Sequence, residues 1–358
     1  MMRDKALFSL PTRHCALVTA LVVATTLLAA CGQAPSAAVS NPKIGVVVDA
    51  GGESDKSFNE YTLKGAREAA QAANLDFAYV GSEVGGDFEQ QIEKLIADGI
   101  DLVVTVGFRQ GDATAKSARR HPDVRFAILD HAYTPGSGCP ETVSDCYTAD
   151  GGLSNVTSLM FAEDEVAYLA GVLAGCMTGT GTVATVAGVE IPPVVRFVTG
   201  FQNGARSARP DVVTLNQYIP DFNDPATGKV VGQGFIRQGA DVIFGAGGNT
   251  GNGGLLAAKE ARVMAIGVDV DQFFTYPEVA EVLLTSASKN VDVAASAAVK
   301  SFAEGQLAPG IRLADLNNGG VGLAPYHDWE SKIPQECKDK VGAAEQTIKA
   351  DPGVTGAK

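Results

Sequence analysis

Short apolar runs rich in β-branched residues alternate along this 358-residue chain with stretches whose apolar residues recur at helical spacing. In the first part of the chain the runs predict strands at 44–48, 76–80, 102–106 and 125–129. A helix is predicted after each of the first three strands, from Phe58 and at 88–99 and 113–120. This order predicts a parallel, doubly wound sheet in an α/β fold.

The alternation returns after 133–152, a segment rich in Gly, Pro, Ser, Thr and Asp that we expect to be a surface excursion. A crossing strand is predicted at 156–161, and further strands at 182–189, 212–218, 241–244, 263–268, 281–286 and 320–323. Helices are predicted at 164–177, from Pro192, and at 229–238, 255–261 and 291–304. The length fits two domains. We predict a first lobe at 43–150 plus 287–312, a second at 151–286 plus 313–345, and a tail at 346–358.

The amino terminus has the pattern of a lipoprotein signal peptide at 1–30. Basic residues precede an uncharged run that ends in Leu-Ala-Ala-Cys31, and the run is shorter than the ~20 residues that span a bilayer. We expect Cys31 to carry lipid such as palmitate, residues 31–42 to form a tether, and the protein to sit on the extracytoplasmic face of the cell membrane. The alternative is an uncleaved anchor with an incidental cysteine.

Charge and cysteine content narrow the possible partners. The formal net charge of −13 argues against nucleic acid as a partner, because binding to phosphates requires a basic surface.

Four cysteines lie beyond the export segment, and in an exported chain they favour disulfides. Three pairings are possible; we favour Cys139 with Cys146 and Cys176 with Cys337. The spacings match no zinc pattern, so no metal site is expected.

The stretch 43–65 reads as strand, loop and helix, with Ser57 and Glu60 in a predicted capping box. Ligands of open parallel sheets bind beyond the carboxyl ends of the strands, so Asp49, Phe58 and Asn59 should face one crevice. A carboxylate, an aromatic face and an amide suit a flat polar molecule. The alternative is that Phe58 packs beneath its loop and Asp49 only caps it.

Two more carboxylates, Asp130 and Asp269, follow predicted strands. They should therefore lie at the carboxyl edges of the predicted sheets. Phe197 lies in the helix that begins with Pro192-Pro193, where proline is tolerated at the first position. Its ring could face Phe58 across a cleft, although it also belongs to a helical apolar stripe that fits a core.

The glycine-rich stretch 245–254 does not have the spacing of a dinucleotide fingerprint or a P-loop. Its glycines either let backbone approach a ligand or form a tight turn before the helix at 255–261. No cofactor is expected. The chain also lacks Gly-x-Ser-x-Gly, His-Glu-x-x-His and Cys-His arrangements, so we do not expect an enzyme.

Six segments in order resemble the basic membrane protein family, bacterial lipoproteins that bind purine nucleosides for ABC transporters. These segments are DAGGESDKSFN, FAILD, EVAYLAGVLAG, IPPVVRFVTGF, GAGGNTGNG and IGVDVDQ with the later SASKNVD. The resemblance implies the type I periplasmic-binding-protein fold, in which two α/β domains are joined by three crossings. The segment 133–152 looks longer than the connection usual in the family, and the link between Lys259 and Ile266 looks shorter.

The resemblance also implies roles for individual residues. Phe58 would stack on the purine, with a second aromatic wall from Phe197 or Phe244. The base edge would be addressed by Asp49, Asn59 and Asp130. The ribose hydroxyls would be held by Asp269 and Lys289, with the backbone at Gly245 to Gly247 closing on the sugar.

The sequence therefore predicts a monomeric receptor that passes adenosine, guanosine or inosine to an ABC permease and its ATPase. A binding protein of the same fold for a sugar or another small polar ligand is the first alternative. A nucleoside hydrolase with clustered aspartates is the second. A sensor or adhesin without a transporter is the third.

Overall fold

The computed structural model describes residues 41–81 and 86–357. The predicted signal peptide, the predicted lipidation site Cys31 and nearly all of the predicted tether lie outside the described residues. In the described ranges, no helix combines the length and the apolar character that crossing a membrane requires.

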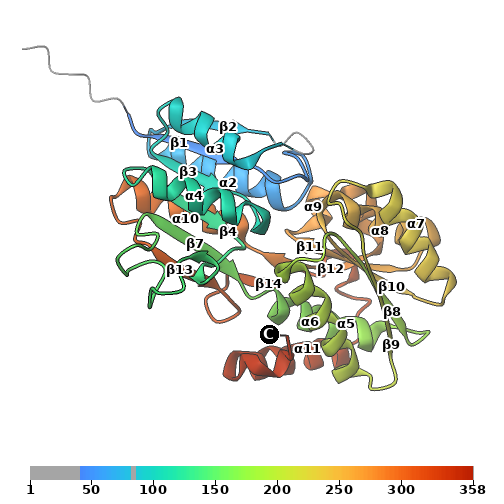
Figure 1. The fold of residues 1–358 in the computed structure, drawn as a ribbon. Helices are drawn as coiled ribbons and strands as arrows, with labels where there is room; N and C mark the ends of the chain where they lie inside the picture. The colour runs from blue at the N-terminus through green and yellow to red at the C-terminus, as the bar shows by residue number, and fades with distance from the viewer. Residues whose placement is uncertain (1–40, 82–85, 358) are drawn as a thin grey trace, which may run out of the picture. The chain divides into compact units, whose positions relative to one another are not determined.

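The first lobe is built on a parallel sheet of six described strands in the order β13-β7-β4-β3-β1-β2 (Figure 1). Its strands are β1 (Lys43–Val47), β2 (Asp76–Val80), β3 (Leu102–Thr105), β4 (Arg125–Leu129), β7 (Val156–Phe161) and β13 (Gly310–Ala314). Its helices are α2 (Phe58–Ala72), α3 (Phe88–Ala97), α4 (Gly111–Arg120) and α10 (Val291–Ala303). The strand β3 is fully buried and β4 is buried after its first residue, as expected for strands covered by helices on both faces.

The second lobe repeats this plan with the described strand order β14-β12-β11-β10-β8-β9, in which β14 is antiparallel to β12. Its strands are β8 (Thr182–Ala187), β9 (Val213–Tyr218), β10 (Val242–Ala246), β11 (Met264–Asp269), β12 (Leu283–Lys289) and β14 (Val321–Leu323). Its helices are α5 (Glu163–Met177), α6 (Pro192–Ala208), α7 (Pro225–Arg237), α8 (Gly248–Ala261), α9 (Gln272–Thr275) and α11 (Gln335–Ala350).

The remaining described elements are short. They are β5 (Thr134–Pro135), β6 (Gly138–Cys139), η1 (Phe108–Gln110), η2 (Pro277–Val282), η3 (His327–Trp329) and η4 (Pro352–Thr355).

The described chain passes between the sheets three times: from β7 to α5, from β12 to α10, and from β13 to β14. This is the predicted periplasmic-binding-protein architecture. The lobe boundaries differ from the prediction. The strand β7 pairs with β4 in the first sheet, so the change of lobe follows Phe161 and not residue 150. The strand β12 pairs with β11 as far as Ser288, so the return to the first lobe follows Lys289 and not residue 286.

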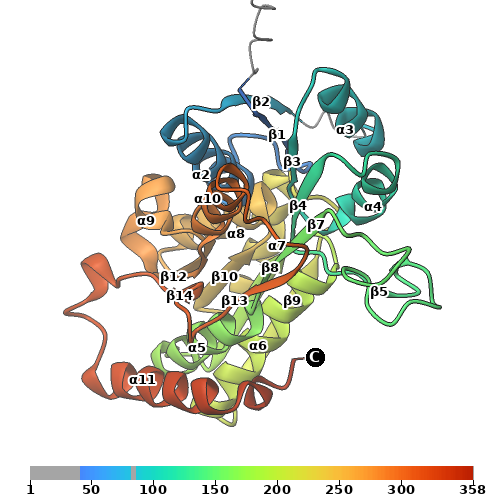
Figure 2. The same cartoon turned by 90° about the vertical axis from the view of Figure 1, so that its left-hand side faces the viewer.

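The predicted tail at 346–358 is part of the second lobe. The helix α11 extends to Ala350 and packs along α5, to which the Cys176–Cys337 disulfide ties it (Figure 2). The turn η4 follows, and Thr355 there is fully buried with its hydroxyl on the Asp164 carboxylate. The sequence predicted a tail here because α11 buries only a narrow apolar stripe.

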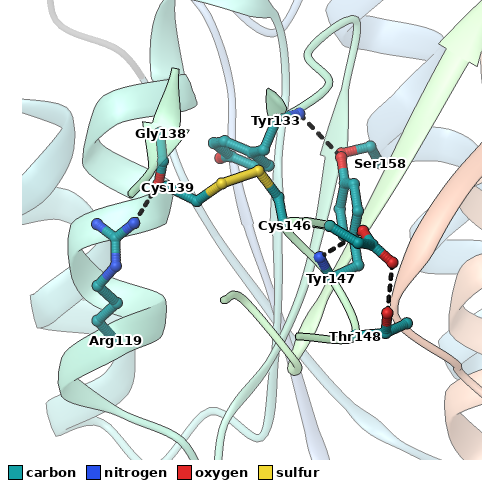
Figure 3. Close-up of a disulfide and its surroundings, with 9 residues drawn as sticks. Arg119, Tyr133, Gly138, Cys139, Cys146, Tyr147, Thr148 and Ser158 are labelled. Carbon is teal, nitrogen blue, oxygen red and sulfur yellow. Dashed lines mark hydrogen bonds between the residues drawn. A yellow bond between two sulfur atoms is a disulfide. The ribbon is translucent and has the colours of Figure 1, made fainter. Parts of the chain in front are cut away.

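The excursion at 133–152 is closed by the favoured Cys139–Cys146 pair and is anchored to the lobe by two tyrosines (Figure 3). The Tyr147 hydroxyl hydrogen-bonds with the Ser158 hydroxyl at 2.7 Å and accepts from the backbone N–H of Tyr133. Both rings are buried, at 2% and 4% exposure. The excursion is therefore only partly a surface feature.

From Gly248 onward the glycine-rich stretch is helical, because α8 begins there, so the alternative of a tight turn before a helix at 255–261 is wrong. Its glycines let α8 lie against α7 at backbone distance. A Cβ on Gly253 would lie 2.1 Å from the carbonyl oxygen of Pro225, and one on Gly228 would lie 2.0 Å from that of Thr250. Close packing of two helices, which leaves no local pattern, is what the sequence could not reveal.

Candidate functional site

A pocket lies where the carboxyl edges of the two sheets face each other, and it encloses about 570 Å³ including its open mouth. Its lining comes from the ends of β1, β4, β11 and β12, from the start of α2, and from the first turns of α6 and α8. Both lobes therefore contribute to one site, as the strand-end rule predicts.

Asp55, and not Ser57, caps α2. The two oxygens of Asp55 accept from the backbone N–H groups of Ser57, Asn59 and Glu60 at 2.9–3.2 Å. The predicted capping box is wrong because the Ser57 hydroxyl is used elsewhere: it donates to Oδ2 of Asp269 in the second lobe at 2.6 Å. Burial raises the pKa of Asp55 to about 6, although the backbone donors oppose the rise.

Asp49 and Asn59 both line the pocket while they are bonded within the first lobe. The Asn59 Oδ1 accepts from the Asp49 backbone N–H at 2.8 Å, and its Nδ2 donates to Asp55 at 3.0 Å. Arg109 donates to Oδ1 of Asp49 at 2.5 Å, and its guanidinium lies 5.5 Å from the Phe222 ring of the second lobe. Arg109 thus compensates the Asp49 charge at the rim of the cleft.

The Lys289 ammonium is the charged centre of the site and is almost fully buried. Its Nζ lies 2.6 Å from Oδ2 of Asp130 and 3.3 Å from Oε1 of Glu163. It also lies 4.6, 5.0 and 5.8 Å from the ring centroids of Phe58, Phe161 and Phe197. Burial works to lower the lysine pKa, but the neighbouring carboxylates outweigh it and raise the pKa, so the cation persists.

The two strand-end aspartates Asp130 and Asp269 share a backbone conformation that is uncommon for residues other than glycine, with φ of 63° and 65°. Burial raises the pKa of both. For Asp130 the pKa rises to about 7, with Lys289 opposing the rise and Glu163 adding to it. Oδ1 of Asp130 is buried and has no hydrogen-bond partner among the described residues.

Two of the three phenylalanines predicted to contact a ligand line the pocket, and the third does not. Phe58 and Phe197 both line it. The alternative second wall, Phe244, does not: it is fully buried, 5.0 Å from the Phe201 ring and 6.0 Å from the Phe197 ring between centroids. Phe244 belongs to a buried hydrophobic cluster that also contains Phe197 and Phe201.

The predicted glycines differ in whether they reach the pocket. Gly247 lines the pocket together with Gly248, whereas Gly245 does not. A Cβ on Gly245 would lie 2.6 Å from the Gly251 carbonyl oxygen, so this glycine serves the packing of α8 on its strand. We therefore correct the prediction that Gly245 approaches a ligand.

Sequence reasoning missed other lining residues, chiefly Asp55, Phe108, Ile191 and Phe222. Phe222 follows β9 and precedes the proline that opens α7. The strand-end rule that selected Asp130 and Asp269 applies to this loop as well and could have identified it. Asp55 was hidden because Ser57 is an equally good capping residue by type.

Comparison with known proteins identifies the family. The family model for PnrA-like substrate-binding proteins of ABC transporters matches residues 42–351. The chain belongs to this family. A relative, the "CD4+ T-cell-stimulating antigen" of Listeria innocua, is 28% identical over 347 residues, covering 89% of this chain and 92% of that protein.

Two other relatives and a solved structure are similar to most of this chain. The "ABC transporter nucleoside-binding protein BmpA" of Lactococcus lactis is 29% identical over 325 residues, covering 86% of each chain. "Basic membrane protein A" of Borreliella burgdorferi is 29% identical over 252 residues, covering 70% of this chain and 69% of that one. The solute-binding protein of an ABC transporter from Aeropyrum pernix superposes with a TM-score of 0.74 at 28% identity, covering 86% of this chain and 91% of that one.

This chain is therefore an ABC transporter substrate-binding protein with two α/β lobes. In such proteins the lobes close on a solute, and the pocket found here lies where that solute would be held.

Proposed function

We propose that this protein captures purine nucleosides in the inter-lobe pocket and delivers them to an ABC permease as a lipid-anchored, extracytoplasmic receptor. The observation that carries the proposal is one pocket that combines aromatic rings from both lobes with Asp130, Asp269 and Lys289. The printed name of the Lactococcus lactis relative, a nucleoside-binding protein, supports the same class of solute.

The apolar part of the pocket suits a flat base. In the proposal Phe58 stacks on one face of the purine, and Phe197 and Phe222 of the second lobe close on the other. Ring stacking contributes roughly 0.5–1.5 kcal/mol per pair beyond the area that is buried. Because the rings belong to different lobes, the base would be enclosed only when the lobes close.

The polar part of the pocket suits the base edge and the ribose. Oδ1 of Asp130, which has no hydrogen-bond partner in the described part of the chain, offers an acceptor for a ring or exocyclic N–H, with Asp49 and Asn59 beside it. Asp269 accepts from vicinal hydroxyls, Lys289 donates to one of them, and Gly247 allows the backbone to approach the sugar. Each hydrogen bond to a charged group contributes about 1.5–3 kcal/mol, enough for affinity near or below micromolar.

Calorimetry tests the ligand. The folded mature protein is titrated with adenosine, guanosine and inosine, and with ribose and hypoxanthine as matched fragments. We expect at least one nucleoside to bind at least 100-fold more tightly than either fragment, because only the whole molecule reaches the rings and the carboxylates together. Ribose binding as tight as that of the nucleosides would favour a sugar receptor instead. Release of free base from a nucleoside would favour a hydrolase.

Fractionation tests the anchor. We propose that Cys31 carries the lipid that holds the protein at the membrane. In a host that lipidates exported proteins, the intact precursor should fractionate with membranes, whereas the Cys31→Ala variant should not be retained by lipid and should lose incorporation of labelled palmitate. Equal labelling of the two proteins would refute the assignment.

A further inference from the structure

A row of four alternating charges leads away from the pocket, formed by Asp130 and Lys289 in its lining and by Glu163 and Arg196 beyond it. Glu163 accepts from Lys289 through Oε1 at 3.3 Å and from Nε of Arg196 through Oε2 at 2.7 Å. Lys289 in turn donates to Asp130 at 2.6 Å. The side chain of Glu163 is fully buried, and neither Glu163 nor Arg196 lines the pocket.

The four residues come from the segments on which closure depends. Asp130 ends β4 of the first lobe, and Glu163 begins α5 directly after the first crossing. Lys289 ends β12 at the second crossing, and Arg196 lies in α6, whose first turns carry Pro193, Val194 and Phe197 into the pocket. Glu163 therefore joins the crossings to a wall of the site.

Because these charges are buried, removing one of them strongly affects its neighbours. A buried charge that loses its partner is costly, so each member of the row is held by the next one. Lys289 is left with one N–H besides those it gives to the two carboxylates, and its ammonium lies at the pocket beside the Phe58 ring. Without Glu163, Asp130 would be the one remaining hydrogen-bond acceptor of that ammonium among the described residues.

We propose that Glu163 and Arg196 are positioning residues, which hold the Lys289 ammonium and the Asp130 carboxylate in the geometry that binds the ligand. This inference rests on the proposed function for the identity of the probe. It goes beyond that function because it assigns roles to two residues that do not touch the pocket.

Two neutral substitutions should act on Asp130 in opposite directions. Glu163→Gln removes a negative charge near Asp130 and should lower the pH at which Asp130 titrates, whereas Arg196→Gln removes a positive charge and should raise it. Loss of packing alone would not produce shifts of opposite sign. The charged or titratable groups that face Asp130 or adjoin it are Lys289 on β12, Glu163 on α5, Asp269 on β11, Arg196 on α6 and the neighbouring His131.

Glu165 provides a matched control on the same turn of α5. It is also acidic and buried, but it accepts from the backbone N–H of Leu316 at the third crossing at 2.9 Å and has no bond to Lys289. The Glu165→Gln variant keeps an oxygen for that N–H. It should therefore retain the affinity of the unmodified protein within about three-fold.

Inosine affinity is measured by calorimetry between pH 5 and pH 9 for the mature protein and the three variants. We expect Glu163→Gln and Arg196→Gln to weaken binding at pH 8 at least ten-fold, with the pH midpoint displaced down in the first and up in the second. The same affinity and midpoint as in Glu165→Gln would overturn the proposal.

A ligand-free measurement separates this inference from the proposed function. The carboxyl carbon of Asp130 is followed by NMR in aspartate-labelled protein and assigned by its loss in Asp130→Asn. Its titration should move down in Glu163→Gln and up in Arg196→Gln even if no nucleoside binds. Shifts that are absent or of the same sign would refute the inference, whether or not inosine binds. If one variant fails to fold, the other still gives a signed result against Glu165→Gln.

Discussion

The Ser57 hydroxyl donates a hydrogen bond of 2.6 Å to Oδ2 of Asp269, although the two residues lie 212 positions apart in the chain. Ser57 belongs to the first lobe and Asp269 to the second, so the bond forms only when the lobes are closed. Beside it the hydroxyl of Thr275 donates to the Lys56 carbonyl oxygen at 2.8 Å, again between lobes. The described conformation is a closed one.

Ser57→Ala should weaken ligand binding about ten-fold or more, because a hydrogen bond to a charged group contributes about 1.5–3 kcal/mol and this one favours closure. Calorimetry with the best nucleoside measures the effect. Ser117→Ala is the matched control, since the Ser117 hydroxyl donates to Glu93 at 2.7 Å within the first lobe. Equal affinities for the two variants would show that the Ser57 bond does not contribute to closure.

Phe222→Leu and Phe244→Leu should separate binding from stability. Phe222 lines the pocket, so its loss should reduce affinity several-fold with little change in thermal midpoint. Phe244 is fully buried outside the lining, so its replacement should cost on the order of 1–2 kcal/mol of unfolding free energy at nearly unchanged affinity. Thermal denaturation and calorimetry on the same samples check both. The reverse pattern would restore Phe244 as the aromatic wall.

The protein should lose stability as pH rises through about 6, because burial raises the pKa of Asp55 to about 6 from its ordinary value of 3.8. A carboxyl whose folded pKa is raised binds its proton more tightly when folded. Its contribution is complete below about pH 3.8 and is lost above about 6, with a limit of about 3 kcal/mol. Unfolding free energy at pH 4.5, 6 and 7.5 should fall more steeply in the unmodified protein than in Asp55→Asn. Parallel curves would contradict the assignment.

The two disulfides should contribute unequally. Cys176 and Cys337 close a loop with a sequence separation of 161, whereas Cys139 and Cys146 are 7 apart. The longer loop restricts the unfolded chain more, so replacing its two cysteines by serine should cost about 2–4 kcal/mol and free α11 for proteolysis. The corresponding Cys139 and Cys146 double variant is the control and should lose less. Chemical denaturation and limited trypsin digestion measure both effects.

Much of the site could be predicted from the residues at the ends of individual strands. Asp130 and Asp269 were found because each ends an apolar run, and the order of the runs placed each at the carboxyl edge of its sheet. The capping of α2 could not be found in this way. Asp55 and Ser57 are both good capping residues, and the choice between them depends on Asp269, which approaches Ser57 only after both lobes have folded.

The sequence by itself determined the alternation of strands and helices, the parallel sheets and the types of residue at the strand ends, because these depend on the spacing and order of residues along the chain. Only the tertiary structure decided that Phe197 and Phe222 line the pocket while Phe244 does not, that the glycines of α8 serve packing, and that Glu163 joins Lys289 to Arg196. These depend on contacts between distant segments. The free energy of such a contact is set by burial and partner geometry, which the order of residues does not express locally.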